Sequence, residues 1–291
     1  MSASPPDALS SAGSASPAEP PPLRLGLLGT GQAARALGPR WQRSGHPLAF
    51  WRGRNDGPLT ETPPADVLIL AVPDSALPEV AAQLATRESA ASETWLHLSG
   101  ALPAGILRLG PTVPAHVGGL HPLVALAEGA DPSGATAGLE GDAVSLPIAR
   151  RLAEAVGLVP LVLTDPDARA LYHAAAVTVA GHATALFSQA LRLMAHAGLD
   201  ADAARRALQP LLLSAAKNLA TLPPARALTG PTARGDASTI ARHLAALTPL
   251  DPSLGATYRL LSREALTLAE DRLSPEQRAA VLEALSGPSP L

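Results

Sequence analysis

The chain has 291 residues, a formal net charge of −3 and no cysteine. Its length suits two packed domains, and its charge provides no positive field for a nucleic-acid backbone. The lack of cysteine excludes disulfides, thiolate nucleophiles and iron–sulfur ligation. Hydrophobic residues make up 47% of the chain and aromatic residues only 2%, so we expect cores of Ala, Leu and Val.

Residues 1–22 are rich in Ser, Ala and Pro, with neither a basic start nor an apolar stretch. This composition is typical of a disordered tail and not of a signal peptide. The best candidate for a membrane span, residues 174–187, is interrupted by His182 and soon followed by Arg192. We therefore expect a cytoplasmic protein that binds neither a membrane nor nucleic acid.

Residues 23–164 alternate short apolar runs with helix-like segments. The runs are LRLGLLG, LAFW, DVLILAVP, TWLHLSG, HVGGLHPL, AVSL and LVPLVLTD. Several are continuously apolar, which is typical of strands covered on both faces. The alternation predicts an α/β domain with a doubly wound, mainly parallel sheet.

Residues 165–291 carry helical patterns and no strand signal of any weight. Pro166, in the first turn, and Gly198, at the end, predict one helix of about 30 residues, or roughly 45 Å. Further helices are expected over residues 201–222, with a kink at Pro210, and over 237–247, 254–273 and 275–285. The second domain is therefore predicted to be all-helical.

The segment GLLGTGQAARALG places a G-x-G-x-x-A pattern directly after a strand and before a helix. Gly29 permits the tight turn, Gly31 lets backbone amides approach a pyrophosphate, and Ala34 lets the helix pack against the strand. The free N–H groups of the helix start would then bind the pyrophosphate. The alternative is an ordinary tight turn between strand and helix.

The second apolar run ends in arginines, at the position where a carboxylate ordinarily hydrogen-bonds the 2′-hydroxyl of the adenosine ribose. A guanidinium at Arg52 or Arg54 can bind a 2′-phosphate with two parallel hydrogen bonds, whereas a carboxylate would repel it. The sequence thus predicts NADP over NAD. The alternative is that both arginines lie in a solvated loop.

The ends of the third and fourth runs are expected beside the nicotinamide ribose, because ligands lie beyond the carboxyl ends of parallel strands. Asp74 follows the third run and either contacts the cofactor or caps the next helix. The expected cofactor-binding residues are Gly29, Thr30, Gly31, Gln32, Ala33, Arg52, Arg54, Val72, Pro73, Ser99 and Gly100.

The segments GLLGTGQAA, ADVLILAVPDSAL, LHLSGAL, GGLHPLVAL, YHAAAVTVAGH and ALTGPTARGD resemble bacterial Rossmann-like proteins that end in domain of unknown function 2520. More distantly, the chain is similar to pyrroline-carboxylate reductases, 3-hydroxyisobutyrate dehydrogenases and imine reductases. The resemblance implies a Rossmann domain plus a helical domain that usually dimerises, and it supplies no substrate. Two features depart from the pattern: His182 stands where related proteins tend to have Asn, and the long helix lacks the lysine of hydroxyisobutyrate-type dehydrogenases.

Hydride transfer needs one positioned group that gives or takes a proton, and histidine is the usual carrier near neutral pH. The candidates are His173 and Tyr172, at the start of the long helix, and His121, at a strand end fixed by Pro122. Tyr172 and His173 point about 100° apart on a helix, so we do not expect both to face one small ligand squarely. The alternatives are structural roles, and His97 is predicted to be a core histidine.

The ALTGPTARGD segment separates two helices and gathers polar groups in an apolar domain. It would anchor an anionic substrate through Arg234 or form a structural turn in which Arg234 pairs with Asp236. The expected substrate-binding residues are Lys217, Asn218, Thr229 and Arg234. No metal-ligand spacing, phosphate-loop motif or hydrolase serine motif occurs in the sequence.

These patterns together favour an NADP(H)-dependent oxidoreductase that reduces a small C=O or C=N group between the two domains. A homodimer through the helical domain is expected. The alternative function is a non-catalytic, dimeric NADP-binding interaction or sensor protein.

Overall fold

The computed structural model describes residues 20–165 and 168–286. Most of the expected N-terminal tail, residues 1–19, and Pro166 of the expected first helical turn lie outside the described residues. The chain divides into two compact units between Ala180 and Gly181, whereas the sequence pattern placed the division after residue 164. The difference arises because the beginning of the long helix packs against the sheet of the first unit.

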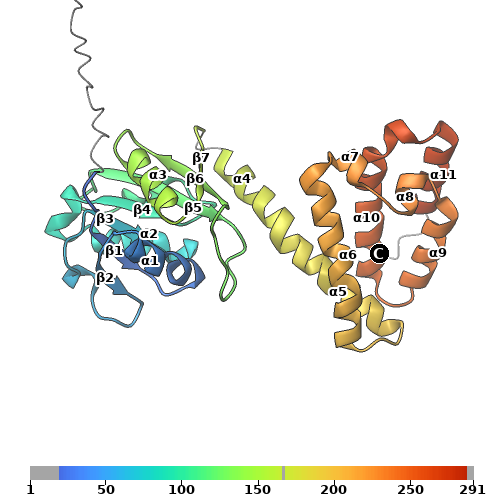
Figure 1. Ribbon diagram of the computed structural model, residues 1–291, viewed down its shortest axis with the longest axis horizontal. Helices are drawn as coiled ribbons and strands as arrows, with labels where there is room; N and C mark the ends of the chain where they lie inside the picture. Colours follow the sequence, from blue (N-terminus) through green and yellow to red (C-terminus); the bar gives the residue numbers. More distant parts are fainter. Residues whose placement is uncertain (1–19, 166–167, 287–291) are drawn as a thin grey trace, which may run out of the picture. The chain divides into compact units, whose positions relative to one another are not determined.

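The first unit is built on one seven-stranded sheet with the order β2-β1-β3-β4-β5-β6-β7 (Figure 1). The strands are β1 Leu25–Leu28, β2 Leu48–Arg52, β3 Val67–Leu70, β4 Thr94–His97, β5 His116–Leu123, β6 Thr136–Gly141 and β7 Val159–Val162. Every neighbouring pair is parallel except β5 with β6. The expected mainly parallel sheet is confirmed, and the carboxyl ends of β1 to β5 lie at one edge.

One predicted strand was wrong. The AVSL run begins α3, Ser145–Ala155, and the strand that pairs with β5 is instead β6. Asp142 fixes this helix start because its carboxylate accepts the backbone N–H groups of Val144 and Ser145. The β6 sequence TAGLEG reads as a loop, since its two glycines and one glutamate hide the apolar pattern of a strand.

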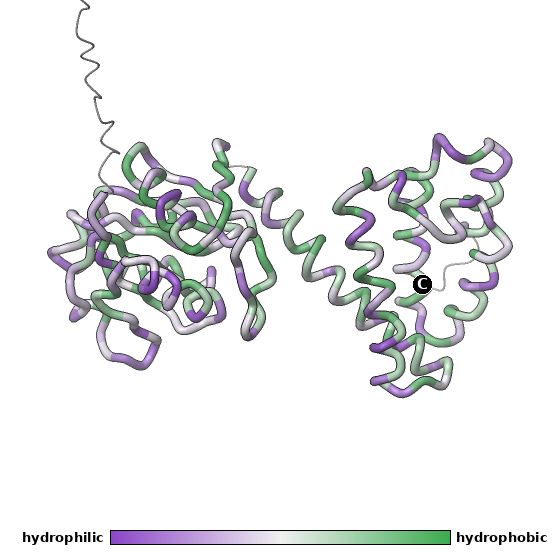
Figure 2. The backbone as a smooth tube through the Cα atoms, in the orientation of Figure 1, coloured by the Kyte–Doolittle hydropathy of each residue, from purple (hydrophilic) through white to green (hydrophobic). Residues whose placement is uncertain are grey.

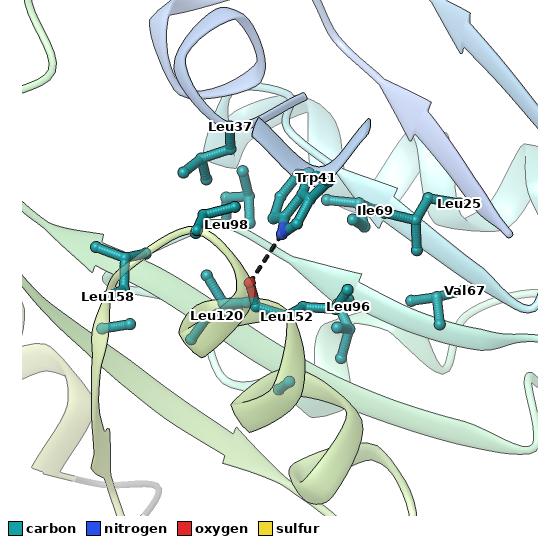
Figure 3. Close-up of a cluster of buried hydrophobic side chains, with 14 of the residues drawn as sticks. Leu25, Leu37, Trp41, Val67, Ile69, Leu96, Leu98, Leu120, Leu152 and Leu158 are labelled. Carbon is teal, nitrogen blue, oxygen red and sulfur yellow. Dashed lines mark hydrogen bonds between the residues drawn. The ribbon is translucent and has the colours of Figure 1, made fainter. Parts of the chain in front are cut away.

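Helices cover both faces of this sheet. Alternate residues of β1 and β3 enter two separate cores, because successive side chains of a strand point to opposite faces. One core includes residues of α1, Gln32–Arg43, and α3, and the other includes residues of α2, Leu77–Leu84. Within the first core the indole N–H of Trp41 donates to the Leu152 carbonyl at 2.8 Å (Figure 3).

The long helix forms as one helical run over Ala168–His196 and contains a π-helical turn, Thr178–His182, between α4, Ala168–Val177, and α5, Ala183–His196. Gly198 follows with a φ of +89°, which a glycine adopts without strain. By length and composition this run is the one described helix that could cross a membrane. Arg169, Tyr172 and His173 belong to the same run, however, and pack against the sheet.

The second unit is helical throughout its described residues. After α5 it contains α6 Ala201–Thr221, α7 Pro224–Ala227, α8 Pro231–Arg234, α9 Ala237–Leu247, α10 Pro252–Leu268 and α11 Pro275–Ser286. Its buried core is small and comes from α9, α10 and α11. The helical prediction for this half of the chain is thereby confirmed.

Candidate functional site

A cleft of about 960 Å³ opens at the carboxyl edge of the sheet. The ends of β1, β2, β3 and β4, together with the first turn of α1, supply its walls. All of the expected cofactor-binding residues except Gly100 line it. The lining also includes Asp74, the first residue of a 3₁₀ turn, Asp74–Ala76.

Two glycines shape the strand-to-helix turn at the base of this cleft. Gly29 has a φ of +112°, and a Cβ atom there would overlap the Ala71 carbonyl of the neighbouring strand end. A Cβ atom on Gly31 would meet nothing within 4 Å, so the backbone at Gly31 faces open space. A cradle of this form fits a pyrophosphate lying on the N–H groups of the α1 start.

The end of β2 forms the neighbouring wall. Trp51 donates its indole N–H to the Gly29 carbonyl at 2.7 Å, which ties β2 to the glycine turn. Arg52 reaches the Pro58 carbonyl at 3.1 Å, and both Arg52 and Arg54 line the cleft. Two guanidinium groups are thus available to an anionic group at this wall.

Directly past the Ser99 side of the cleft, three aromatic side chains gather. The His121 Nδ1 atom lies 3.0 Å from the Tyr172 hydroxyl, and the ring of His121 meets the rings of Tyr172 and His173 edge-on with centroids 5.6 and 5.5 Å apart. A Cβ atom on Gly100 would overlap His173 and approach His121 to 2.8 Å. Only a glycine at position 100 leaves room for both histidines.

The sheet-facing stripe of α4 brings these side chains together. Arg169, Tyr172, His173 and Ala176 follow the i, i+3, i+4, i+7 spacing of one helix face, and the α4 residues between them are exposed. Tyr172 and His173 both reach His121 from this stripe. The expectation that they do not both face one small ligand squarely stays a prediction.

Glycines on neighbouring strands leave room for the side chains of this stripe. The sheet register pairs Gly119 of β5 with His97 of β4 and Glu140 of β6, and it pairs His121 with Gly138. A Cβ atom on Gly119 would lie 2.8 Å from the Arg169 guanidinium, and one on Gly138 would lie 2.5 Å from the Tyr172 hydroxyl. The hydroxyl therefore sits over Gly138, directly opposite His121.

Burial keeps His121 and His97 uncharged near neutral pH. Desolvation, followed by His173 and then Arg169, lowers the pKa of His121 to about 4, although Asp74 opposes the shift. Desolvation and Arg169 lower the pKa of His97 to about 3, and burial raises the pKa of the Tyr172 hydroxyl. At neutral pH His121 and His97 are neutral imidazoles that can donate or accept hydrogen bonds.

The core position expected for His97 is confirmed, since its side chain is fully buried. Its Nδ1 atom accepts the Ser99 N–H at 3.1 Å, whereas its Nε2 atom has no hydrogen-bond partner among the described residues. A histidine with a folded-state pKa below its unfolded value stabilises the fold above pH 6.5, and this contribution is lost as the pH falls.

We expect the free energy of unfolding to fall between pH 7 and pH 5, with about 2 kcal/mol of the loss due to His97. Over this range the unfolded imidazole takes up a proton that the folded one, with a pKa of about 3, does not. Urea unfolding at both pH values measures the effect. A His97→Gln variant should lose about 2 kcal/mol less than the parent, and equal losses would contradict this account of His97.

Two residues of this region, Arg169 and Glu140, were not predicted from the sequence. Arg169 is 1% exposed and its guanidinium contacts the Glu140 carboxylate at 2.7 Å. Two features of the sequence could have pointed to them. One is the helical spacing of Arg169 to Tyr172 and His173, and the other is the run of glycines in β5 and β6. They could be interpreted only with the strand register, which the sequence did not supply.

The expected substrate-binding residues Lys217, Asn218, Thr229 and Arg234 all belong to the second unit. Lys217, Thr229 and Arg234 are exposed. Asp236 caps α9, because its carboxylate accepts the Thr239 N–H at 3.0 Å. Hydrogen bonds from the Thr239 hydroxyl and the Thr239 N–H, followed by one from the Ser238 hydroxyl, lower the pKa of Asp236 to about 2. A substrate role for the four residues stays a prediction.

Comparison with known proteins agrees with the resemblance seen in the sequence. The family profile of domain of unknown function 2520 matches residues 135–265, which include β6, α4 and most of the second unit. None of the curated proteins matches the sequence. The resemblance to this domain is therefore confirmed over those residues.

Solved structures of similar fold extend over most of the chain. A protein of Bacteroides fragilis described as a candidate NADP oxidoreductase shares 22% identity at a TM-score of 0.71, covering 84% of this chain and 98% of its own. A protein of Thermotoga maritima shares 22% identity at a TM-score of 0.66, with 85% and 99% covered. Plasmodium falciparum pyrroline carboxylate reductase with NADP bound shares 11% identity at a TM-score of 0.57, covering 89% of this chain and 98% of its own. At these identities the similarity shows the fold: a Rossmann sheet followed by helices.

Proposed function

We propose that this protein is an NADP(H)-dependent oxidoreductase that reduces a small C=O or C=N group. One observation carries the proposal: a glycine-cradled cleft ends, at Ser99, beside a hydrogen-bonded pair of proton-transferring side chains, His121 and Tyr172. A dinucleotide in the cleft and a proton donor at its end are the two requirements of hydride transfer.

The cofactor fits the chain's own residues. Gly31 and the α1 start would hold the pyrophosphate, Arg52 and Arg54 the 2′-phosphate, and Val72, Pro73 and Ser99 the nicotinamide ribose. The description of the Plasmodium reductase, which holds NADP, supports this assignment at the level of a shared fold. When bound, NADPH supplies the hydride.

His121 is proposed as the group that supplies the proton. Its imidazole is neutral near pH 7, so the donor is an Nε2–H group and not an imidazolium. In this tautomer Nδ1 accepts the Tyr172 hydroxyl proton. As Nε2 gives its proton to the oxygen or nitrogen of the reduced substrate, Nδ1 takes the proton of Tyr172. Nδ1 then returns that proton to the tyrosine and solvent reprotonates Nε2, so both side chains regain their starting forms.

His173 adds a polar atom at the same place. Its buried Nδ1 atom has no hydrogen-bond partner among the described residues and lies over Gly100. A buried polar atom without a partner is costly, so it is suited to hold a ligand atom. We propose that it orients the substrate.

Turnover of bound NADPH tests the function. The purified protein is mixed with NADPH and a panel of keto acids, aldehydes and cyclic imines, and absorbance at the nicotinamide band is followed. We expect oxidation with at least one compound class. Tight NADPH binding without turnover of any compound would contradict the enzyme and favour the second candidate.

That second candidate is a non-catalytic NADP-binding module. Two observations favour it. The lysine of related dehydrogenases is absent from the long helix. His121 has a pKa of about 4, so near neutral pH it is a neutral imidazole and a weaker acid than an imidazolium. Under this function NADP would switch or stabilise a dimer. Measurement of dimer stability with and without NADP distinguishes the two.

A homodimer through the helical unit is proposed as well. Leu211, Leu212 and Leu213 of α6 are 67%, 45% and 61% exposed. Figure 2 shows hydrophobic stretches, in green, among the helices of this unit. Three consecutive helix residues point about 100° apart, so folding within the unit leaves more than one face uncovered. Apolar exposure of this extent marks an interface, and a second copy offers the same apolar surface in return.

We expect light scattering to give twice the monomer mass of 29.5 kDa for the parent and the monomer mass for a Leu211→Glu, Leu213→Glu variant. Buried charges without partners destabilise an interface, whereas exposed ones do not. Val113→Glu is the control, because Val113 is an exposed apolar residue of the first unit. A parent of monomer mass would disprove the dimer.

A further inference from the structure

A buried guanidinium stands between the long helix and the cofactor cleft. Arg169 donates from Nη1 to the Glu140 carboxylate at 2.7 Å and from Nη2 to the Ser99 carbonyl at 2.5 Å. Ser99 lines the cleft at the carboxyl end of β4, where the nicotinamide ribose is expected. The guanidinium therefore bonds directly to a residue of the cleft wall.

Glu140 completes a clamp on the same turn. Its second carboxylate oxygen accepts the Ala104 N–H at 2.5 Å, while its first is bonded to Arg169. Residues 99–104 are thus held at both ends, at Ser99 by Arg169 and at Ala104 by Glu140. Within the turn the Ser99 hydroxyl accepts the N–H groups of Ala101 and Leu102.

A glycine in the sheet leaves room for the Arg169–Glu140 pair. Gly119 lies between His97 and Glu140 in the register of β4, β5 and β6, and a Cβ atom there would lie 2.8 Å from the Arg169 guanidinium. Arg169 sits one helical turn before Tyr172 and His173. The position of the whole α4 stripe, including both aromatic side chains, is consequently tied to the position of Ser99.

We propose that Arg169, with Glu140, is a positioning residue that sets the nicotinamide end of the cofactor cleft and aligns it with the His121–Tyr172 pair. The proposal rests on the proposed function, since it presumes a nicotinamide beside Ser99. Arg169 acts through Ser99 and the turn, and it touches neither the cofactor nor the substrate.

Arginine is required for this role because its two η-nitrogens bind acceptors from separate segments, Glu140 on β6 and the Ser99 carbonyl just past the end of β4. A lysine ammonium is a point charge on a flexible stem and would not hold both acceptors in a fixed geometry. Stability alone does not call for the pair, since buried ion pairs are often replaceable by apolar residues without loss. Lysine at position 169 should therefore disturb alignment while preserving the charge.

The guanidinium also adds to the electrostatic field at His121. The groups that face this imidazole are Tyr172, His173 and Arg169 of α4, Asp74 beyond β3 and His97 of β4. Arg169 and His173 disfavour the protonated imidazole and Asp74 favours it. The charge-preserving Arg169→Lys change leaves these signs in place, so it separates alignment from charge.

The test compares two buried arginine–glutamate pairs. Arg87 bonds Glu93 at 2.8 Å and the Pro63 carbonyl, and Glu93 accepts the Ala65 N–H, so this pair has the same construction away from the cleft. Dissociation constants for NADPH and for 2′,5′-ADP, which carries only the adenosine half, are measured by titration on Arg169→Lys and Arg87→Lys. Melting temperatures are recorded for both.

We expect Arg169→Lys to raise the dissociation constant for NADPH about tenfold, which corresponds to the loss of one charged hydrogen bond. The dissociation constant for 2′,5′-ADP should stay within about twofold of the parent's. Arg87→Lys should lower the melting temperature without changing either dissociation constant. Unchanged NADPH affinity in Arg169→Lys, or equal weakening of both ligands, would overturn the proposal. NADPH binding without turnover contradicts the proposed function alone, and a parent that binds no NADPH overturns both.

Discussion

Replacement of His121 by Asn is expected to lower kcat for NADPH oxidation by about 10²- to 10⁴-fold, the range for loss of a positioned proton donor. The amide keeps a polar side chain over Gly100 but cannot pass a proton from Tyr172 to the substrate. Because His121 does not line the cofactor cleft, the dissociation constant for NADPH should stay within about threefold of the parent's.

The chain contains a matched control for this experiment. His243 and Tyr258 of the second unit form a second pair, with a 2.8 Å hydrogen bond and rings that meet edge-on at 5.7 Å. A Tyr258→Phe variant removes a hydroxyl from the same kind of contact and should leave kcat unchanged. Equal losses in the His121 and Tyr258 variants would point to damaged folding and not to chemistry.

Tyr172→Phe separates the relay from the donor. This change leaves the imidazole in place and removes the proton that Nδ1 accepts, so kcat should fall less than in His121→Asn. Binding of NADPH should again be unaffected. If Tyr172→Phe retained full activity, the relay through Tyr172 would be disproved while His121 could still donate.

The second large effect concerns the choice of cofactor. Arg52→Asp combined with Arg54→Ala should raise the dissociation constant for NADPH about 10²- to 10⁴-fold, because two charge-assisted contacts to the 2′-phosphate are lost and a carboxylate is added. Affinity for NADH should change little or improve, since a carboxylate at this strand end can bind the ribose 2′-hydroxyl.

Titration of parent and variant with both cofactors measures this preference. Arg43→Ala is the control, because Arg43 is an exposed arginine of α1 that does not line the cleft. A parent that binds NADPH and NADH equally would contradict the role of the arginines. A salt series adds a check, since the preference for NADPH should weaken as ionic strength rises.

The sequence alone was sufficient for the fold class and for most of the residues that line the cleft at the carboxyl edge of the sheet. Gly29, Gly31 and Arg52 are close in sequence, and a strand–turn–helix–strand unit fixes their arrangement locally, so their spacing predicts where they lie. The same reasoning failed at β6, where Gly138 and Glu140 interrupt the apolar pattern. Gly138 leaves room for Tyr172, and Glu140 pairs with Arg169. These tertiary contacts require residues that interrupt the apolar pattern by which a strand is recognised in the sequence.

What only the tertiary structure decided is the convergence of side chains from β4, β5, β6 and α4. Sequence reasoning selected His121, Tyr172 and His173 separately but could not tell that they meet, nor that Arg169 and Glu140 join them to Ser99. Contacts between residues 29 to 70 positions apart depend on strand register and on which face a helix buries. Both are set by packing of the whole unit, and no local pattern in the chain contains them.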